Sequence, residues 1–203
     1  MEKLLARLER RFGRYAIEQL TVVIVGGTAA VFLISMIQPS FLNMLTLDLH
    51  QVQQGQIWRL FTYLFIPGSH SPIWILFSLY MTWFVGTQLE HEWGAFKFNC
   101  FYLFGMIGTT LAAALAGRAV GNDWFHLSLY LAFATLFPNF EVFLFFVLRI
   151  KVKWLGLLMV FFLLVSFVLG GWGTRGAILA AFSNYFLFFG EHWWTEWKLR
   201  KRK

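Results

Sequence analysis

Six stretches of this chain are apolar over most of their length, and this pattern predicts six membrane-crossing helices. The stretches are residues 18–37, 71–89, 95–116, 123–137, 154–172 and 174–192. A helix needs roughly 20 residues to cross about 30 Å of hydrocarbon, and five of the stretches come near that length. The fourth would extend only about 22 Å at 1.5 Å per residue. We therefore expect a six-helix bundle in which neighbouring helices shield a short fourth helix.

The segment between the first two spans, residues 38–70, is not hydrophilic. Its large apolar side chains are Phe41, Leu42, Met44, Leu45, Leu47, Leu49, Ile57, Trp58, Leu60, Phe61, Leu64 and Phe65. A loop surrounded by water would not expose so much apolar surface. This first loop is therefore expected to lie partly in the membrane interface.

Two further segments have a regular pattern. In residues 1–15 apolar side chains recur at nearly helical spacing with arginines between them, which predicts a basic amphipathic helix. Such a helix would lie on an anionic leaflet, or its arginines would only flank the first span. Apolar and basic residues alternate over residues 148–153, which predicts an extended segment at the interface.

Composition agrees with a membrane protein, because 59% of the 203 residues are hydrophobic and only 13% are charged. Soluble domains contain about a quarter charged residues. The sequence thus divides into a basic segment (1–17), one membrane domain (18–192) and a basic tail (193–203). The single cysteine, Cys100, excludes an internal disulfide, and five scattered histidines predict neither a metal site nor a cofactor.

The net charge of +7 could suggest nucleic acid, but its distribution favours membrane orientation. With six spans, 14 of the 17 basic residues fall on the side of the two chain ends and three on the other. Those three are Arg59, Arg118 and Arg175. Because cytoplasmic loops are rich in Lys and Arg, both ends are predicted to be cytoplasmic. Anionic lipid is the expected partner of these cations, and nucleic acid is not.

Several short motifs resemble the rhomboid family and occur in the same order, over about residues 50 to 182. The first-loop motif is Trp58-Arg59 followed by Thr62-Tyr63, and the second-helix motif is Gly86, Leu89-Glu90 and Gly94. The other two are Leu136-Phe137-Pro138-Asn139 and the small pair Gly176 and Ala180. The resemblance implies a compact rhomboid-like six-helix bundle. Since the connection after the fourth helix is similar to that of bacterial members, a bacterial inner membrane is expected.

Active rhomboids are intramembrane serine proteases, and the resemblance implies where their catalytic groups would fall. The serine of a Gly-x-Ser-Gly motif corresponds to Asp123, the histidine of helix six to Gly173, and the asparagine of helix two to Ser78. A serine nucleophile needs a base within hydrogen-bond reach, so these positions predict a degenerate site with no catalytic residue.

Two polar residues near this region have alternative interpretations. Asp123 is expected to cap the fourth helix, or else to bind Arg118 or a polar group of a substrate. Arg59 is expected to tether the first loop through its backbone carbonyls or near Glu90, and the alternative is an arginine that reaches the interface.

These observations lead to one functional hypothesis and two alternatives. The first is a catalytically inactive, Derlin-like pseudoprotease that binds transmembrane segments of client proteins. The second is an active intramembrane serine protease with a non-standard dyad. The third, a small transporter or channel, would need charges along a path through the membrane, and the spans contain almost none apart from Asp123.

Overall fold

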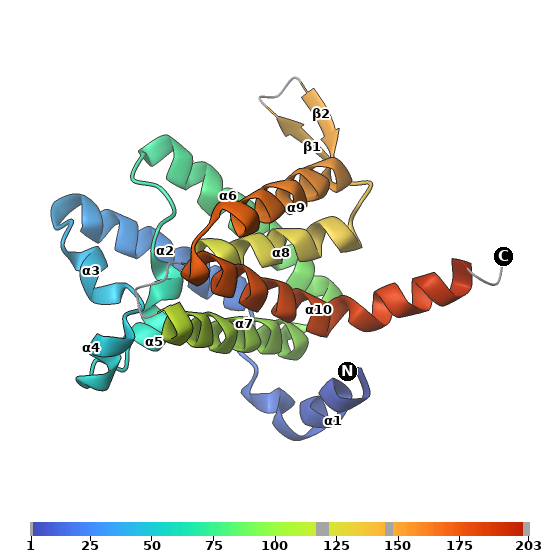
Figure 1. Cartoon of the computed structure of the whole chain (residues 1–203), viewed down its shortest axis with the longest axis horizontal. Coiled ribbons are helices and arrows are strands. Elements are labelled where there is room, and N and C mark those ends of the chain that lie inside the picture. The colour runs from blue at the N-terminus through green and yellow to red at the C-terminus, as the bar shows by residue number, and fades with distance from the viewer. Residues whose placement is uncertain (1, 117–121, 145–147, 201–203) are drawn as a thin grey trace.

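The computed structural model describes residues 2–116, 122–144 and 148–200, and they form a bundle of long helices (Figure 1). The long helices are α2 (Leu20–Ile37), α6 (Pro72–Trp93), α7 (Ala95–Ala116), α8 (Asp123–Leu136), α9 (Val152–Leu169) and α10 (Trp172–Arg200). The first loop contains α3 (Phe41–Leu45), α4 (Leu49–Gln53), α5 (Arg59–Thr62) and the 3₁₀ turn η2 (Tyr63–Phe65). The chain begins with α1 (Glu2–Phe12) and η1 (Gly13–Tyr15).

The short helix α8 lies at the centre of the bundle, in contact with α6, α7, α9 and α10. Leu129 and Ala132 on α8 are completely buried. The first-loop helices gather at one end of the bundle, and both ends of the chain lie at the other (Figure 1). The predicted short fourth helix therefore contacts four of the other long helices.

Each predicted stretch corresponds to one of the long helices, and most ends differ by a few residues. By length and hydropathy, α2 and α9 are the two described helices that could each cross a membrane, and residues 125–136 form a shorter apolar helix. Membrane crossing by the other long helices stays a prediction.

The largest boundary difference is at the C-terminus, where α10 runs without a break past the predicted boundary at 192–193 to Arg200. The segment Glu191–Arg200 contains neither glycine nor proline, so nothing in it stops a helix. Similarly, α6 continues beyond the predicted residue 89 to Trp93. Gly94 then ends it with a positive φ of 78°, which glycine adopts without strain.

The second-helix motif holds α2 against α6. Glu90 accepts hydrogen bonds from the backbone N of Leu20 at 3.1 Å, from the backbone N of Thr21 at 3.4 Å and from Thr21 Oγ1 at 3.0 Å. A Cβ atom at Gly86, one turn earlier, would lie 2.6 Å from Thr21 Cγ2. Glycine therefore allows the close approach of the two helices, and Glu90 caps the N-terminus of α2.

The small pair predicted on the last helix does not act as a pair. A Cβ atom at Gly176 would meet no described residue within 4 Å, whereas one at Gly108 on α7 would lie 3.4 Å from Ala180 Cβ. Ala180 thus packs on α7, whereas Gly176 has no such close contact among the described residues. The closest glycine contact of α7 is at Gly105, where the Phe125 ring from α8 occupies the position of a Cβ atom.

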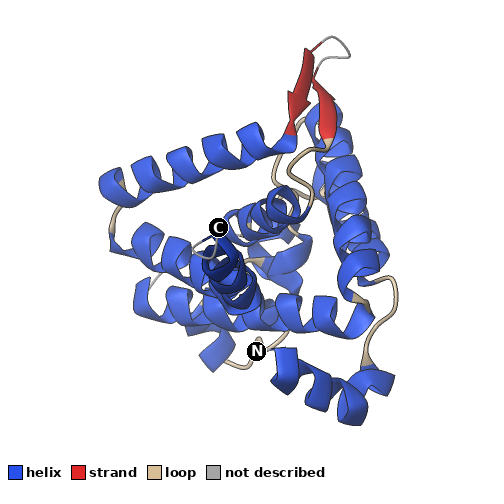
Figure 2. Ribbon diagram, turned by 90° about the vertical axis from the view of Figure 1, so that its right-hand side faces the viewer, coloured by secondary structure: helices blue, strands red, loops and turns tan. Residues whose placement is uncertain are grey.

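The alternating segment predicted over residues 148–153 is extended only as far as Lys151, because α9 already begins at Val152. It pairs with a second strand that the sequence pattern did not predict. β1 (Glu141–Leu144) and β2 (Leu148–Lys151) are antiparallel, with Glu141 opposite Lys151 and Val142 opposite Ile150. Val142 and Ile150 are half-buried, whereas Glu141 and Lys151 are exposed. Figure 2 shows this hairpin, in red, projecting from the helices.

Candidate functional site

The first loop is fixed by the Trp-Arg pair. Arg59 is buried, and its guanidinium donates to the backbone oxygens of Asn43 at 2.7 Å and Thr46 at 2.8 Å and to Gln56 Oε1 at 2.7 Å. Trp58 Nε1 donates to the Met44 carbonyl oxygen at 3.3 Å. The expected tether through backbone carbonyls is present. The suggested contact with the region of Glu90 is wrong, because Glu90 binds the start of α2.

The loop also contributes to the core. Leu47 and Tyr63 are completely buried, and Leu64 is nearly so. Burial raises the pKa of the Tyr63 phenol to about 12, so its ring stays neutral. Anchoring in the core accounts for these three side chains. Other large apolar side chains of the loop are exposed, namely Met44, Ile57, Trp58 and Phe61.

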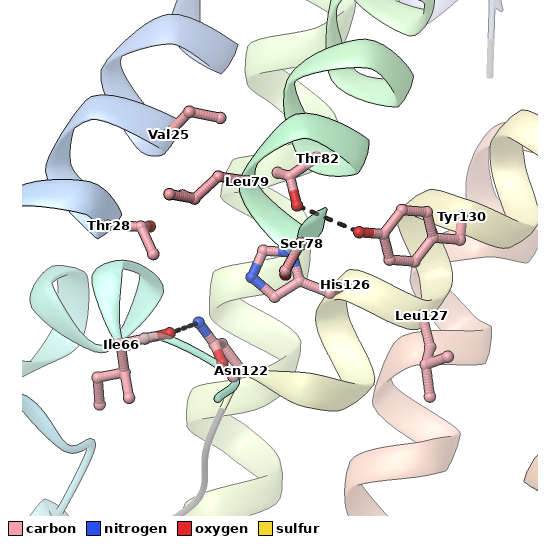
Figure 3. A pocket seen from close by; sticks show the side chains of 11 residues that line it. Val25, Thr28, Ile66, Ser78, Leu79, Thr82, Asn122, His126, Leu127 and Tyr130 are labelled. Carbon is pink, nitrogen blue, oxygen red and sulfur yellow. Dashed lines mark hydrogen bonds between the residues drawn. The ribbon is translucent and has the colours of Figure 1, made fainter. Parts of the chain in front are cut away.

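Beneath the loop lies a cavity of about 330 Å³ between α2, α6 and α8 (Figure 3). Its lining includes six polar side chains, at Thr28, Ser78, Thr82, Asn122, His126 and Tyr130. The Thr82 and Tyr130 hydroxyls are 3.2 Å apart and share a hydrogen bond. The cavity, which we call the polar cavity, thus contains groups that can donate and accept hydrogen bonds.

Asn122 belongs to this cavity, and sequence reasoning missed it. Its side-chain nitrogen donates to the backbone oxygens of Leu64 and Ile66, both at 3.0 Å, and joins the first loop to α8. Asn122 is also the N-cap residue of α8, so the expectation that Asp123 caps the helix is wrong: Asp123 is the first helical residue. A polar pair before an apolar run identifies a helix start but does not tell which residue occupies the N-cap.

The three degenerate positions are not all brought together. Ser78 lines the polar cavity, and Asp123 begins α8 immediately after Asn122; its side chain lies outside the described residues. Gly173 is the second residue of α10 and does not line the cavity.

Two serine hydroxyls, one buried on α8 and one exposed on α10, bind their own helices. Ser128 Oγ donates to the Phe125 carbonyl oxygen and Ser183 Oγ to that of Leu179, each at 2.7 Å. Ser78 and His126 both line the polar cavity (Figure 3). Within the described part of the chain there is no group of three His, Cys, Asp or Glu side chains that could hold a metal ion.

A second hollow, the lateral groove, lies between α6 and α9 with α8 behind it and has a volume of about 480 Å³. Its walls are mostly apolar and include Phe77 and Met81 from α6, and Leu155 and Met159 from α9. The floor includes Phe133 and Ala134 of α8. Gly156 allows α9 to approach α8 closely at this floor, because a Cβ atom there would lie 2.8 Å from Ala134 Cβ.

The lateral groove and the polar cavity adjoin each other. Gly68, Ser78 and Tyr130 line both of them. The mostly apolar lateral groove therefore borders the polar interior space.

Comparison with known proteins identifies a family. No curated protein matches this chain. A family model described as "Eukaryotic integral membrane protein (DUF1751)" matches residues 18–189. The predicted bacterial inner membrane is therefore wrong, because the family is eukaryotic. The connection after the fourth helix, which suggested it, is a short local motif that does not identify the membrane. The chain belongs to the DUF1751 family of eukaryotic, multi-pass integral membrane proteins.

Proposed function

We propose that this protein is a non-catalytic, rhomboid-like membrane protein that binds a transmembrane segment of another protein in the lateral groove. In this proposal all six long helices cross the membrane, and the first loop lies in the interface at one end. The observation that carries the proposal is the groove of about 480 Å³ between α6 and α9.

The chemistry of the groove supports a helix as its occupant. Helices associate in lipid through close packing and hydrogen bonds, since lipid chains are as apolar as the side chains. The groove offers an apolar hollow for packing, together with the hydroxyl groups of Ser69, Ser78 and Tyr130 along its edge. Lipid chains could fill the hollow but could not bond these hydroxyls, which favours a peptide segment over lipid.

The proposal excludes catalysis because of the hydrogen bonds that the serine hydroxyls make. Proteolysis would need a serine hydroxyl bonded to a base and donors placed around an oxyanion. Ser128 and Ser183 instead donate to backbone oxygens of their own helices. The polar cavity is then a place for hydrogen bonding rather than for peptide cleavage.

The proposal predicts that filling the groove weakens binding. Met159→Trp adds volume inside the groove, and Leu157→Trp adds the same ring on the outer face of α9, where Leu157 is 61% exposed. Binding of a defined single-pass reporter helix, measured by energy transfer in lipid vesicles, should fall roughly tenfold for Met159→Trp and remain unchanged for Leu157→Trp. Equal binding by the two variants would contradict the proposal.

The alternative, a protease with a non-standard dyad, is favoured by one observation: Ser78 and His126 line the same cavity. A fluorophosphonate probe labels serines that a neighbouring base activates. Our proposal predicts no labelling above that of Ser78→Ala. A labelled serine that is lost in Ser78→Ala would establish the alternative.

A further inference from the structure

A third hollow, the α2–α7 groove, has a volume of about 440 Å³ and shares no lining residue with the polar cavity or the lateral groove. Its walls include Val23 and Ile24 of α2, and Leu103 and Met106 of α7. Asn99, a polar residue of the wall, uses both ends of its side-chain amide on backbone atoms of the protein. An occupant of this groove therefore needs apolar surface rather than hydrogen-bonding groups.

The groove extends through about half of the membrane thickness. Along α7 its wall runs from Phe96 to Met106, which corresponds to about 15 Å at 1.5 Å per residue. The hydrocarbon of a bilayer is about 30 Å thick. Toward the first loop the groove is lined by Phe65, whose ring fills the space that a Cβ atom at Gly27 would occupy. The length of the groove thus matches the acyl chains of one leaflet.

The N-terminal segment is fixed at the other end of the groove. The backbone N of Ile17 donates to Asn99 Oδ1 at 3.1 Å, and Asn99 Nδ2 donates to the Ile17 carbonyl oxygen at 2.9 Å. Leu5 on α1 is only 5% exposed and packs with the buried core. The position of α1 and η1 relative to the groove is therefore set by contacts with the bundle, at the end opposite the first loop (Figure 1).

Two arginines lie at this end of the groove, directly on aromatic residues that line it. Arg11 Cζ is 5.5 Å from the centre of the Phe12 ring, and Arg14 Cζ is 4.7 Å from the centre of the Tyr15 ring. Arg14 also donates to the Tyr15 hydroxyl at 2.6 Å, a bond that takes one of the five N–H donors of a guanidinium. Both arginines are exposed, and arginine binds phosphate through paired N–H donors. Phosphate-binding groups and an apolar groove therefore adjoin each other.

We propose that the α2–α7 groove binds one acyl chain of an anionic phospholipid whose phosphate lies at Arg11 and Arg14. Residues 2–18 contain five basic and three acidic side chains, and this positive charge favours an anionic lipid over a zwitterionic one. The site holds a single lipid, which distinguishes it from the general attraction of a basic helix to an anionic leaflet. Because it lies apart from the lateral groove, the inference goes beyond the proposed function and does not depend on it.

Photoreactive lipids test the inference. The full chain is reconstituted in phosphatidylcholine vesicles with a trace of phosphatidylserine or of phosphatidylcholine that carries a photoreactive group on one acyl chain, and adducts are mapped by mass spectrometry. Leu103 lines the groove and is 51% exposed, whereas Leu157 lies on the outer face of α9 and is 61% exposed. The ratio of phosphatidylserine to phosphatidylcholine adducts should be about tenfold higher around Leu103 than around Leu157.

Charge-matched variants separate the site from the general charge of α1. In Arg11→Gln with Arg14→Gln the adduct ratio around Leu103 should fall about tenfold, to the value on the outer face of α9. Arg7→Gln with Arg10→Gln removes the same charge from exposed positions of the same helix and should keep the ratio within about twofold. The midpoint of thermal unfolding shows that both double variants keep the fold.

Three results would overturn the inference. Equal adduct ratios around Leu103 and Leu157 would mean that ordinary solvating lipid fills the groove. Equal losses in the two double variants would mean that only the total charge of α1 matters. Groove adducts that an excess of the single-pass reporter helix abolishes would assign the groove to a peptide. None of these results bears on binding in the lateral groove, so the proposed function is tested separately.

Discussion

Replacing Arg59 with alanine is expected to lower the free energy of unfolding by about 3–5 kcal/mol. The buried guanidinium makes three hydrogen bonds of 2.7–2.8 Å, two of them to backbone oxygens of the first loop. Bonds to charged groups contribute roughly 1.5–3 kcal/mol each, and carbonyl oxygens left buried without a donor add a further cost. The measurement is reversible unfolding in mixed micelles, followed by tryptophan fluorescence.

Arg175 provides a matched control. It also donates to two backbone oxygens, those of Phe167 at 3.0 Å and Val168 at 3.1 Å, but it is less buried than Arg59. Water can replace its bonds, so Arg175→Ala should cost no more than about 1 kcal/mol. Equal losses in the two variants would mean that Arg59 is an ordinary interfacial arginine and that other contacts hold the loop.

The second large effect is expected at Glu90. Its carboxylate accepts three hydrogen bonds at the N-terminus of α2, where the helix has no other side-chain cap. Glu90→Ala should destabilise the protein by about 2–4 kcal/mol. Glu90→Gln keeps one acceptor oxygen but loses the charge at the positive end of the helix, and should cost about 1–2 kcal/mol.

Hydrogen exchange locates this effect. The amides of Leu20 and Thr21 should lose protection in Glu90→Ala, whereas those in the middle of α9 should change only with global stability. Glu92 is exposed two residues later, and Glu92→Ala should change stability by less than about 0.5 kcal/mol. Unchanged protection at Leu20 and Thr21 in Glu90→Ala would show that Glu90 does not cap α2.

The helices were predictable from the sequence because long apolar runs and glycine or proline boundaries are local features. Pro72 begins α6 at the first helical position, and Gly94 ends it. The length of the fourth run was enough to predict a short helix shielded by its neighbours. The continuation of α10 was missed because a change from apolar to charged residues does not by itself end a helix.

Features that depend on contacts between distant segments were harder to predict from the sequence. The pairing of β1 with β2 requires the register of two strands, whereas the sequence shows only the alternation within one of them. Arg59 could be identified as a tether, but its acceptors Asn43 and Thr46 lie 16 and 13 residues away and carry no signal of their own. The partner of Glu90 is 69 residues away on another helix.

The candidate site was predicted only in part. The resemblance to rhomboids directed attention to Ser78, which lines the polar cavity, but not to Asn122, Thr82 or Tyr130. These three become a group only when α6, α8 and the first loop come together. The lateral groove had no counterpart in the sequence analysis, because it depends on how far apart α6 and α9 lie.

The most direct test of the account is to locate a bound helix by photo-cross-linking. A photoreactive amino acid replaces Met159, inside the lateral groove, or Leu157, on the outer face of the same helix, and the protein is reconstituted with the single-pass reporter helix. The account predicts a cross-linked reporter from position 159 that excess unlabelled reporter abolishes, and no such adduct from position 157. Equal adducts from the two positions, or none from position 159, would contradict it.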